Sequence, residues 1–420
     1  MSFILSAEAR RDPAALPYYE FVAMIALLMA LNAAAIDVYI PALQDIGSAL
    51  GVVDENKRQF VITAYIIGFG GAQIIYGPLS DRFGRRSVLF AGLSIYLLGA
   101  IAAIFVPTFE ALLFTRLVQG IGAAATRVIA TSVVRDRYHG PQMASVMSLV
   151  MMVFMVMPVF APNIGSAVLV FGTWRELSAF MFLFGLAALI WAWARLPETL
   201  NPADRRPLRI KPVAEAFRIV LTNRIAFCYT LAMASFFGAL FAFISQAEQV
   251  YTGIYNIGPH FTIYFSMVAV FMAASSFANS RLVSRFGIKK LSHGALLGFI
   301  AVAGLHLGLA MAYGGATPFP LFLTLFVIMM CFFGFVPTNF NAMAMEPLGR
   351  VAGVASSVLG SAQTLGGGLL GGFIGYLYNG TLIPLLSGFL GLACLSLICV
   401  LVAEKGRLFG AAPRAVITKP

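Results

Sequence analysis

Long apolar runs separated by short charged turns dominate this chain of 420 residues and restrict the folds open to it. A helix that crosses a bilayer needs about 20 mostly apolar residues. The chain contains twelve such runs, at 18–42, 58–79, 87–106, 109–133, 141–169, 173–196, 224–247, 260–282, 290–313, 318–342, 350–377 and 380–404. Because backbone groups in hydrocarbon must bond within their own segment, the runs predict an all-α membrane protein with twelve transmembrane helices.

Composition supports a membrane protein and argues against several other classes. The chain is 60% hydrophobic and 11% charged, whereas soluble domains are about 45–50% apolar and about 25% charged. The net charge of +11 lies in the turns rather than on one soluble face, so we expect no nucleic-acid partner. Four histidines are scattered, four cysteines lie in apolar runs without metal-ligand spacing, and no nucleotide-binding motif is present. We therefore expect neither a metal nor a cofactor.

The distribution of basic residues predicts the orientation. With the N-terminus inside, 23 of the 28 Lys and Arg residues fall in inside segments and three fall in outside loops. Short loops rich in Lys and Arg stay cytoplasmic, so both termini are expected in the cytoplasm.

The longest connection, 197–223, predicts the division of the chain. It separates an N-terminal six-helix bundle (1–196) from a C-terminal one with a short cytoplasmic tail (224–420). A short repeat supports this division, since Asp81-Arg-Phe-Gly84 is echoed by Ser284-Arg-Phe-Gly287. Two related halves predict a cavity between them at the bilayer midplane.

The segment Gly77-Pro-Leu-Ser-Asp-Arg-Phe-Gly-Arg-Arg86 is a water-facing turn, because its charges cannot rest in hydrocarbon. It resembles the signature turn between the second and third helices of major facilitator superfamily transporters. The matching positions are Gly77, Leu79, Asp81, Arg82, Gly84, Arg85 and Arg86. This resemblance implies the major facilitator fold of two pseudo-symmetric six-helix bundles. It also implies an inner latch in which Asp81 lies near the start of the eleventh helix and Arg85 contacts Asp136. From the residues alone, a solvated surface cluster is the alternative.

Ionisable groups inside the first and fourth helices are candidates for function. Asp37 and Arg116 lie about 8 and 10 Å from the outer ends of their helices, so we expect them to pair. The alternative is that each reaches the outer headgroups separately. For Arg127 the sequence leaves two interpretations open, a functional role and contact with cytoplasmic lipid phosphates.

These positions also resemble motifs of one transporter group. Asp37 with Pro41 resembles the first-helix motif of drug:proton antiporters, and Arg116-x-x-Gln-Gly resembles the fourth-helix motif implicated in proton coupling. The segment from Pro158 through Ala161 and Pro162 to Gly165 is similar to the fifth-helix antiporter motif. Together they resemble the Bcr/CflA multidrug efflux subgroup. The resemblance implies alternating-access antiport in which a proton neutralises Asp37 and weakens its hold on Arg116.

The expected substrate cavity is mostly apolar, with a few polar groups, which suits amphipathic compounds. The candidates are Asn32, Tyr39, Tyr65, Gln73, Phe154, Met155, Phe237, Phe241, Gln246, Asn339, Asn341 and Gln363. Their alternative is ordinary helix packing or contact with lipid.

The expected function is proton-coupled export of drugs or other amphipathic small molecules across the cell inner membrane by a monomer. Its partners are then the substrate, protons and the bilayer. The alternatives are export or import of a specific metabolite or nutrient and, further removed, a polytopic membrane enzyme or a passive channel.

Overall fold

The computed structural model describes residues 16–138, 140–205 and 210–410, and every regular element in these ranges is helical. The helices up to the linker are α1 (Tyr18–Asp37), α2 (Leu43–Ala49), α3 (Phe60–Phe83), α4 (Arg85–Phe105), α5 (Phe109–Arg137), α6 (Gly140–Phe171) and α7 (Trp174–Arg195). Those that follow are α8 (Ile210–Thr222), α9 (Arg224–Glu248), α10 (Phe261–Phe286), α11 (Ile288–Ala312), α12 (Phe319–Phe333), α13 (Pro337–Met345), α14 (Ala352–Ser361), α15 (Gly367–Tyr376) and α16 (Ile383–Ala403).

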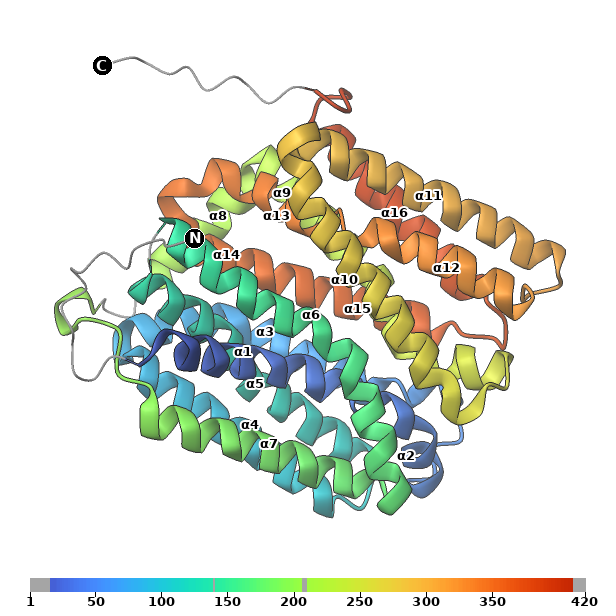
Figure 1. Ribbon diagram of the computed structural model, residues 1–420, viewed down its shortest axis with the longest axis horizontal. Helices are drawn as coiled ribbons and strands as arrows, with labels where there is room; N and C mark the ends of the chain where they lie inside the picture. The colour runs from blue at the N-terminus through green and yellow to red at the C-terminus, as the bar shows by residue number, and fades with distance from the viewer. Residues whose placement is uncertain (1–15, 139, 206–209, 411–420) are drawn as a thin grey trace, which may run out of the picture.

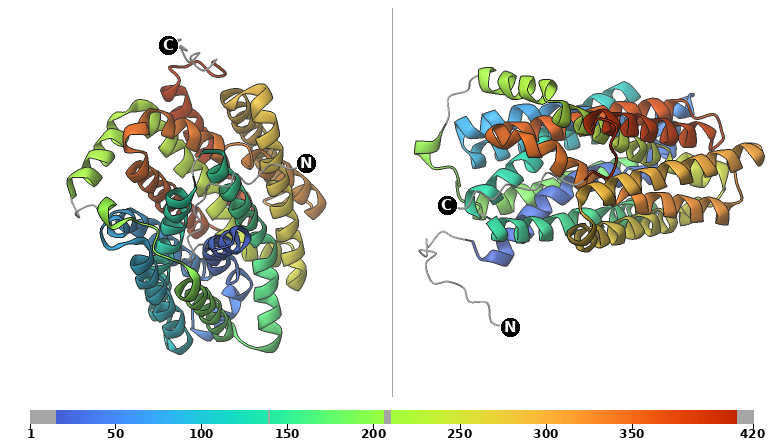
Figure 2. Two further views of the ribbon diagram at one scale, coloured as in Figure 1. Left: turned by 60° about the vertical axis from the view of Figure 1, so that its left-hand side comes forward. Right: turned by 90° about the horizontal axis from the view of Figure 1, so that it is seen from above.

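The helices form two bundles that lie side by side (Figure 1). In the N-terminal bundle, α5 packs between α3 and α4, while α1 packs on α6 and α4 on α7. In the C-terminal bundle, α9 packs against α13, α15 and α16. The bundles meet along two seams, α6 with α10 and α3 with α14 and α15, and Figure 2 shows α6 and α10 next to each other. The residue limits of the halves stay a prediction.

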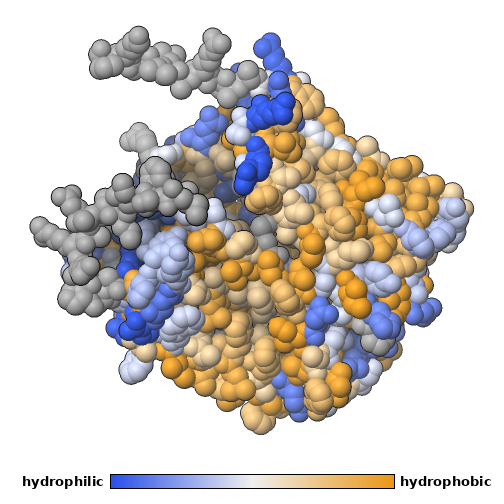
Figure 3. Space-filling model, viewed as in Figure 1, coloured by the Kyte–Doolittle hydropathy of each residue, from blue (hydrophilic) through white to orange (hydrophobic). Residues whose placement is uncertain are grey.

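The outer surface has the pattern expected in a bilayer. Large apolar side chains are exposed around the bundles, among them Phe114, Phe171 and Phe277. In Figure 3 an apolar band crosses the face, and hydrophilic residues gather toward the ends of the helices. Eleven helical stretches in the described ranges are long and apolar enough to cross a membrane.

The eleventh predicted helix, 350–377, is present as three shorter pieces and is not among these eleven stretches. The α-helices α14 and α15 are joined by a π-helical segment, η7 (Ala362–Gly366), so no single piece is long enough to span. The residues at both junctions keep right-handed helical angles, and the backbone therefore continues from 352 to 376. Short π segments occur mostly as bulges within α-helices and are frequent at functional sites.

Two other predicted helices end earlier than expected because of proline. The run 18–42 stops at Asp37, since Pro41 has no N–H to donate to the carbonyl four residues before it, and the chain continues through a 3₁₀ turn into α2. The run 318–342 breaks between Phe333 and Pro337 for the same reason. The linker 197–223, in which no helix was predicted, contains α8.

Candidate functional site

A fully buried arginine lies at the centre of the N-terminal bundle. Arg116 of α5 donates from Nη2 to the Ala35 carbonyl (2.6 Å) and from Nε to the Val61 carbonyl (3.2 Å). Its Nη1 donates to Oε1 of Gln119, 2.5 Å away. These bonds are strong because the donor is charged. They tie α5 to α1 and α3, so Arg116 fixes the relative position of the three helices.

Two tyrosine rings enclose the Arg116 guanidinium. Its carbon lies 4.2 Å from the centre of the Tyr39 ring and 4.7 Å from that of the Tyr65 ring, within cation–π range. The Tyr39 hydroxyl lies 2.7 Å from Oγ of Ser178, and the Tyr65 hydroxyl donates to Asn32 over 3.5 Å. Both tyrosines are fully buried, so they surround Arg116 and do not line an open cavity in this structure.

The predicted ion pair between Asp37 and Arg116 is absent, and the prediction is wrong for this structure. The Asp37 side chain is 3% exposed, and no hydrogen bond or ion pair to its carboxylate occurs in the described part of the chain. Arg116 instead contacts Ala35 and Tyr39, which lie two residues to either side of Asp37. Positions two residues apart on a helix point about 160° apart. The depths of the two charges match, but their directions do not.

The motif on α6 lies against the turn that follows Asp37. A Cβ at Gly165 would overlap the Val38 carbonyl and lie 2.9 Å from Cγ of Pro41, so glycine permits this close approach. Ala161 and Pro162 are buried, whereas Pro158 is only half-buried. Asp37 and the α6 motif therefore meet at one end of α1, while Arg116 holds the same turn from α5.

A second charged cluster lies at the opposite end of the bundle. Arg85, at the start of α4, donates from Nε to Asp136 (2.9 Å) and from Nη1 to Asp81 (2.5 Å). Nη1 also donates to Oγ of Ser80, 2.7 Å away. The expected contact between Arg85 and Asp136 is present. Its action as a gate stays a prediction.

Glu198, which sequence reasoning missed, completes this cluster from the linker. Its carboxylate accepts from the backbone N–H groups of Arg85 (2.9 Å) and Arg86 (3.2 Å), at the N-terminus of α4. A carboxylate is favoured there by the free N–H groups and the helix dipole. Gly84, which precedes them, has φ +96° and lies against Glu198. The available signal was an acidic residue at the start of a connection that carries more basic than acidic residues.

The other members of the predicted latch occupy different environments. A Cβ at Gly77 would lie 3.3 Å from Oγ of Ser357, so this glycine faces α14 across the seam between the bundles. Arg82 is exposed, with its guanidinium carbon 5.8 Å from the centre of the Phe83 ring. The side chains at 350–353 lie outside the described residues, so the expected proximity of Asp81 to the start of the eleventh helix is untested.

Glycine allows the two bundles to touch closely. A Cβ at Gly70 of α3 would lie 2.7 Å from the Leu365 backbone nitrogen, inside the π segment. The Gly70 carbonyl accepts from Oγ of Ser361 at 2.6 Å. On the other seam, Nδ2 of Asn163 in α6 donates to Oγ of Ser266 in α10 at 2.8 Å. Direct polar contacts therefore join the halves on both seams.

The remaining candidates for the substrate cavity do not form one lining. Asn32 is buried and donates to Thr126, while Asn339 is buried and donates to Asn279. Gln73 is buried and donates to Thr364 across the seam, 3.4 Å away. In the described ranges no side-chain hydrogen bond joins the others to a site: Phe241, Gln246 and Gln363 are buried, Phe237 is half-buried and Asn341 is exposed. The side chains of Phe154 and Met155 lie outside the described residues.

A buried carboxylate in the second half was also missed. Glu248, at the end of α9, is 8% exposed and lies in the same region as Arg58 and Glu55 of the other half. Next to it, Nε2 of Gln249 donates to Oδ1 of Asn56 over 3.2 Å. Glu248 lies one residue beyond the predicted apolar run 224–247, and the sequence therefore placed it in a loop outside the membrane. The second half therefore also contains a buried carboxylate.

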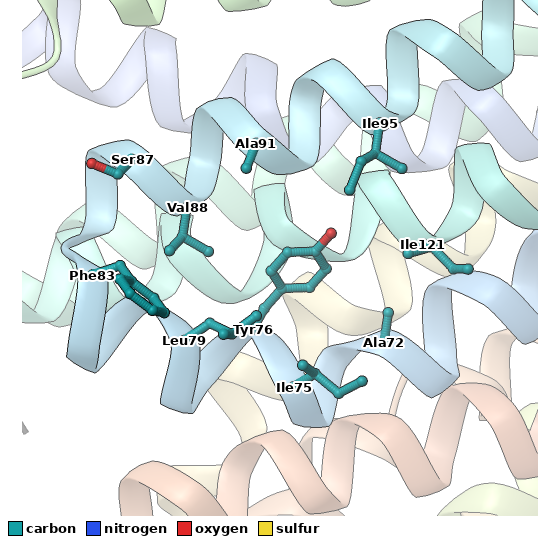
Figure 4. A pocket seen from close by; sticks show the side chains of 10 residues that line it. All are labelled: Ala72, Ile75, Tyr76, Leu79, Phe83, Ser87, Val88, Ala91, Ile95 and Ile121. Atoms are coloured by element: carbon teal, nitrogen blue, oxygen red, sulfur yellow. The ribbon is translucent and has the colours of Figure 1, made fainter. Parts of the chain in front are cut away.

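A surface groove of about 440 Å³ runs between α3 and α4 (Figure 4). Its lining is apolar except for Ser87 and Tyr76, and Ile75 and Phe83 are exposed at its edge. None of the predicted cavity residues line it. Since exposed apolar residues form its rim, lipid chains are the expected occupants.

Comparison with known proteins relates the chain to one family of transporters. Residues 25–371 match the family model of the Major Facilitator Superfamily. A "Bicyclomycin resistance protein homolog" of Haemophilus influenzae is 30% identical over 378 residues, which cover 87% of this chain and 91% of the relative. "Multidrug resistance protein D" of Escherichia coli is 28% identical over 354 residues, 83% of this chain and 86% of the relative.

Solved structures share the fold. The xylose transporter XylE from E. coli, in a partially occluded inward open conformation, superposes with a TM-score of 0.70 at 14% identity. The match covers 92% of this chain and 97% of that chain. At this level of identity, the likeness concerns the fold alone.

Proposed function

The chain belongs to the major facilitator superfamily, and from that premise we propose that it exports drugs or other amphipathic small molecules in exchange for protons by alternating access. Two relatives that match over most of their length are named for resistance to bicyclomycin and to multiple drugs, which supports export of toxic compounds. The fold itself supports a multi-pass membrane transporter rather than an enzyme.

The arrangement around the end of α1 is the observation that carries the proton coupling. Asp37 is buried without a partner in the described residues. Its carboxylate must therefore be stabilised by water or a cation, or be neutralised by a proton. Arg116 holds Ala35 and Tyr39 on either side of it. Protonation of Asp37 therefore acts on a turn whose position Arg116 sets, and Arg116 is a positioning residue rather than the counter-ion of Asp37.

The contact with α6 connects this turn to the seam between the bundles. Gly165 lies against the Val38 carbonyl, and two residues before it Asn163 donates a hydrogen bond to Ser266 of the other half. A shift of the turn when Asp37 gains or loses its proton changes the support of α6 at the seam. This series of contacts links protonation of Asp37 to the relative motion of the two halves, which alternating access requires.

The cluster around Arg85 is assigned to the cytoplasmic end. Its ion pairs with Asp81 and Asp136, together with the bonds to Glu198, brace α3, α4, α5 and the start of the linker. We assign this brace to the closing of the inner gate. We further assign the chain to the cell inner membrane as a monomer with both termini in the cytoplasm, as the distribution of basic residues predicts.

Reconstituted vesicles test the coupling. We expect Asp37→Asn to abolish efflux of an ethidium-type dye driven by an imposed pH gradient, while the dye still binds. Asp45→Asn is the matched control, because Asp45 is exposed eight residues further along the same segment. Gradient-driven transport by Asp37→Asn at the rate of the unmodified protein would refute the role of Asp37.

Export or import of a specific metabolite or nutrient is the second candidate. A pump-deficient host that expresses the chain, grown across a panel of antibiotics and dyes, separates the two. Resistance to several compounds supports export of drugs. Resistance to none, together with accumulation of a nutrient, supports import.

A further inference from the structure

A second arginine, Arg127, lies in the interior of the same helix as Arg116. The two are eleven residues apart, three turns of helix, so both project from nearly the same face of α5. Ala123 and Val134 share that face and are fully buried. Phe114, which is 66% exposed, lies about 140° around the helix. Arg127 is half-buried, and the accessible part of its side chain therefore faces the protein interior rather than lipid.

The guanidinium of Arg127 does not extend toward the cytoplasmic headgroups. Its carbon lies 5.9 Å from the centre of the Phe69 ring. Phe69 is fourteen residues before the end of α3 at Phe83, which corresponds to about 21 Å along the helix. The sequence left contact with lipid phosphates open for Arg127. Its place beside Phe69, deep in the bundle, excludes that contact in this structure.

Arg127 differs from Arg116 in having no polar partner. In the described ranges its side chain makes no hydrogen bond and no ion pair, and Phe69 is its ring contact. Arg116, in contrast, donates to three oxygens and lies between two rings. An embedded guanidinium with all five N–H donors unused is costly unless an anion or water satisfies it. The Arg127 guanidinium is therefore available to donate hydrogen bonds to an acceptor on a bound ligand.

The surroundings of Arg127 indicate the kind of acceptor. A guanidinium binds a planar oxyanion such as a carboxylate through two parallel hydrogen bonds. The Phe69 ring beside it stacks on Tyr65, with ring centres 6.1 Å apart and an angle of 14° between the planes. An aromatic surface next to a free guanidinium suits a flat apolar body that carries an acidic group.

From these observations we propose that Arg127 is the anion-recognition site of the transporter and that its substrates include aromatic carboxylates. The carboxylate binds the Arg127 guanidinium, and the aromatic body lies near Phe69. This inference deepens the proposed export function and rests on it for the statement that the bound anion is transported. The binding step itself does not depend on proton coupling.

Binding of 2-naphthoate and of its neutral analogue 2-naphthamide to the purified full chain tests the proposal. Isothermal titration calorimetry is expected to give tighter binding of 2-naphthoate than of the amide. Arg127→Gln is expected to weaken 2-naphthoate binding at least tenfold and to leave the amide unchanged. Arg127→Lys keeps the charge but loses the paired donors, so an intermediate loss is expected. Arg135→Gln is the control, since it removes one charge from the same helix at an exposed position.

The possible outcomes separate this inference from the export proposal. Equal binding of the two probes, binding of neither, or an unchanged preference in Arg127→Gln would overturn anion recognition by Arg127. Arg127→Lys supplies the comparison if Arg127→Gln does not fold, and an unchanged preference in it would count against the paired-donor geometry. Selective binding without transport of 2-naphthoate down a pH gradient would leave the site intact and contradict export.

Discussion

Replacement of Asp37 by asparagine tests whether Arg116 is the counter-ion of Asp37 or a residue that positions the turn around it. If Asp37 and Arg116 formed a buried ion pair, removal of one charge would lower the free energy of unfolding by about 3–5 kcal/mol, because the other charge would remain buried and unpaired. In the structure Arg116 is satisfied by two carbonyls, Gln119 and two rings, and none of these contacts involves the Asp37 carboxylate. We therefore expect Asp37→Asn to leave the free energy of unfolding unchanged within about 1 kcal/mol or to raise it.

The assay is unfolding in mixed micelles by titration with sodium dodecyl sulfate, monitored by tryptophan fluorescence. A double-mutant cycle of Asp37→Asn with Arg116→Gln is expected to give a coupling energy below about 0.5 kcal/mol. The same cycle on Arg85 and Asp136, which are 2.9 Å apart, is expected to give about 1–2 kcal/mol and serves as the positive control. A loss of 3 kcal/mol or more in Asp37→Asn would refute the reasoning, even if Arg116→Gln could not be purified.

Two further substitutions address the seam and the inner cluster. Gly70→Ala introduces a Cβ 2.7 Å from the Leu365 nitrogen, so we expect dye efflux to slow at least several-fold with little change in the unfolding of each half, whereas Gly71→Ala, with open space around it, is expected to transport normally. Equal rates in the two variants would show that the close contact at the seam does not limit transport. Glu198→Gln weakens two charge-assisted bonds at the start of α4, and we expect it to lower the free energy of unfolding by about 1–2 kcal/mol. Glu215→Gln, at an exposed position of α8, should leave stability unchanged, and equal losses in the two glutamates would contradict the role of Glu198.

The helix breaks show where reasoning from the sequence stopped. Pro41 and Pro337 were visible in the apolar runs, and a missing N–H predicts an interruption four residues earlier at most. Whether the chain then kinks, unwinds or continues depends on what the neighbouring helices offer the freed carbonyls. The π segment from Ala362 to Gly366 has no such marker, because it forms where Gly70 of the other bundle comes within contact of Leu365.

The embedded charges show the same limit. Their positions along the sequence fixed how deep Asp37, Arg116 and Arg127 lie, and depth alone suggested that the first two pair. The rotation of each helix about its own axis then determined which residues these three side chains contact. Arg116 lies against Tyr39 and Tyr65, Arg127 lies near Phe69, and in the described ranges no ion pair joins Asp37 to either arginine.

The motifs of the sequence indicated a transporter, and the sequence by itself determined a helical membrane protein whose positive charge is predicted to lie mostly on one side. Run length, apolar content and loop charge are one-dimensional quantities, and they are enough because a bilayer acts on each segment separately. The tertiary structure alone decided which buried charges are satisfied and which is free, because side-chain direction is set when helices pack against one another. That packing leaves the Arg127 guanidinium without a polar partner in the described ranges.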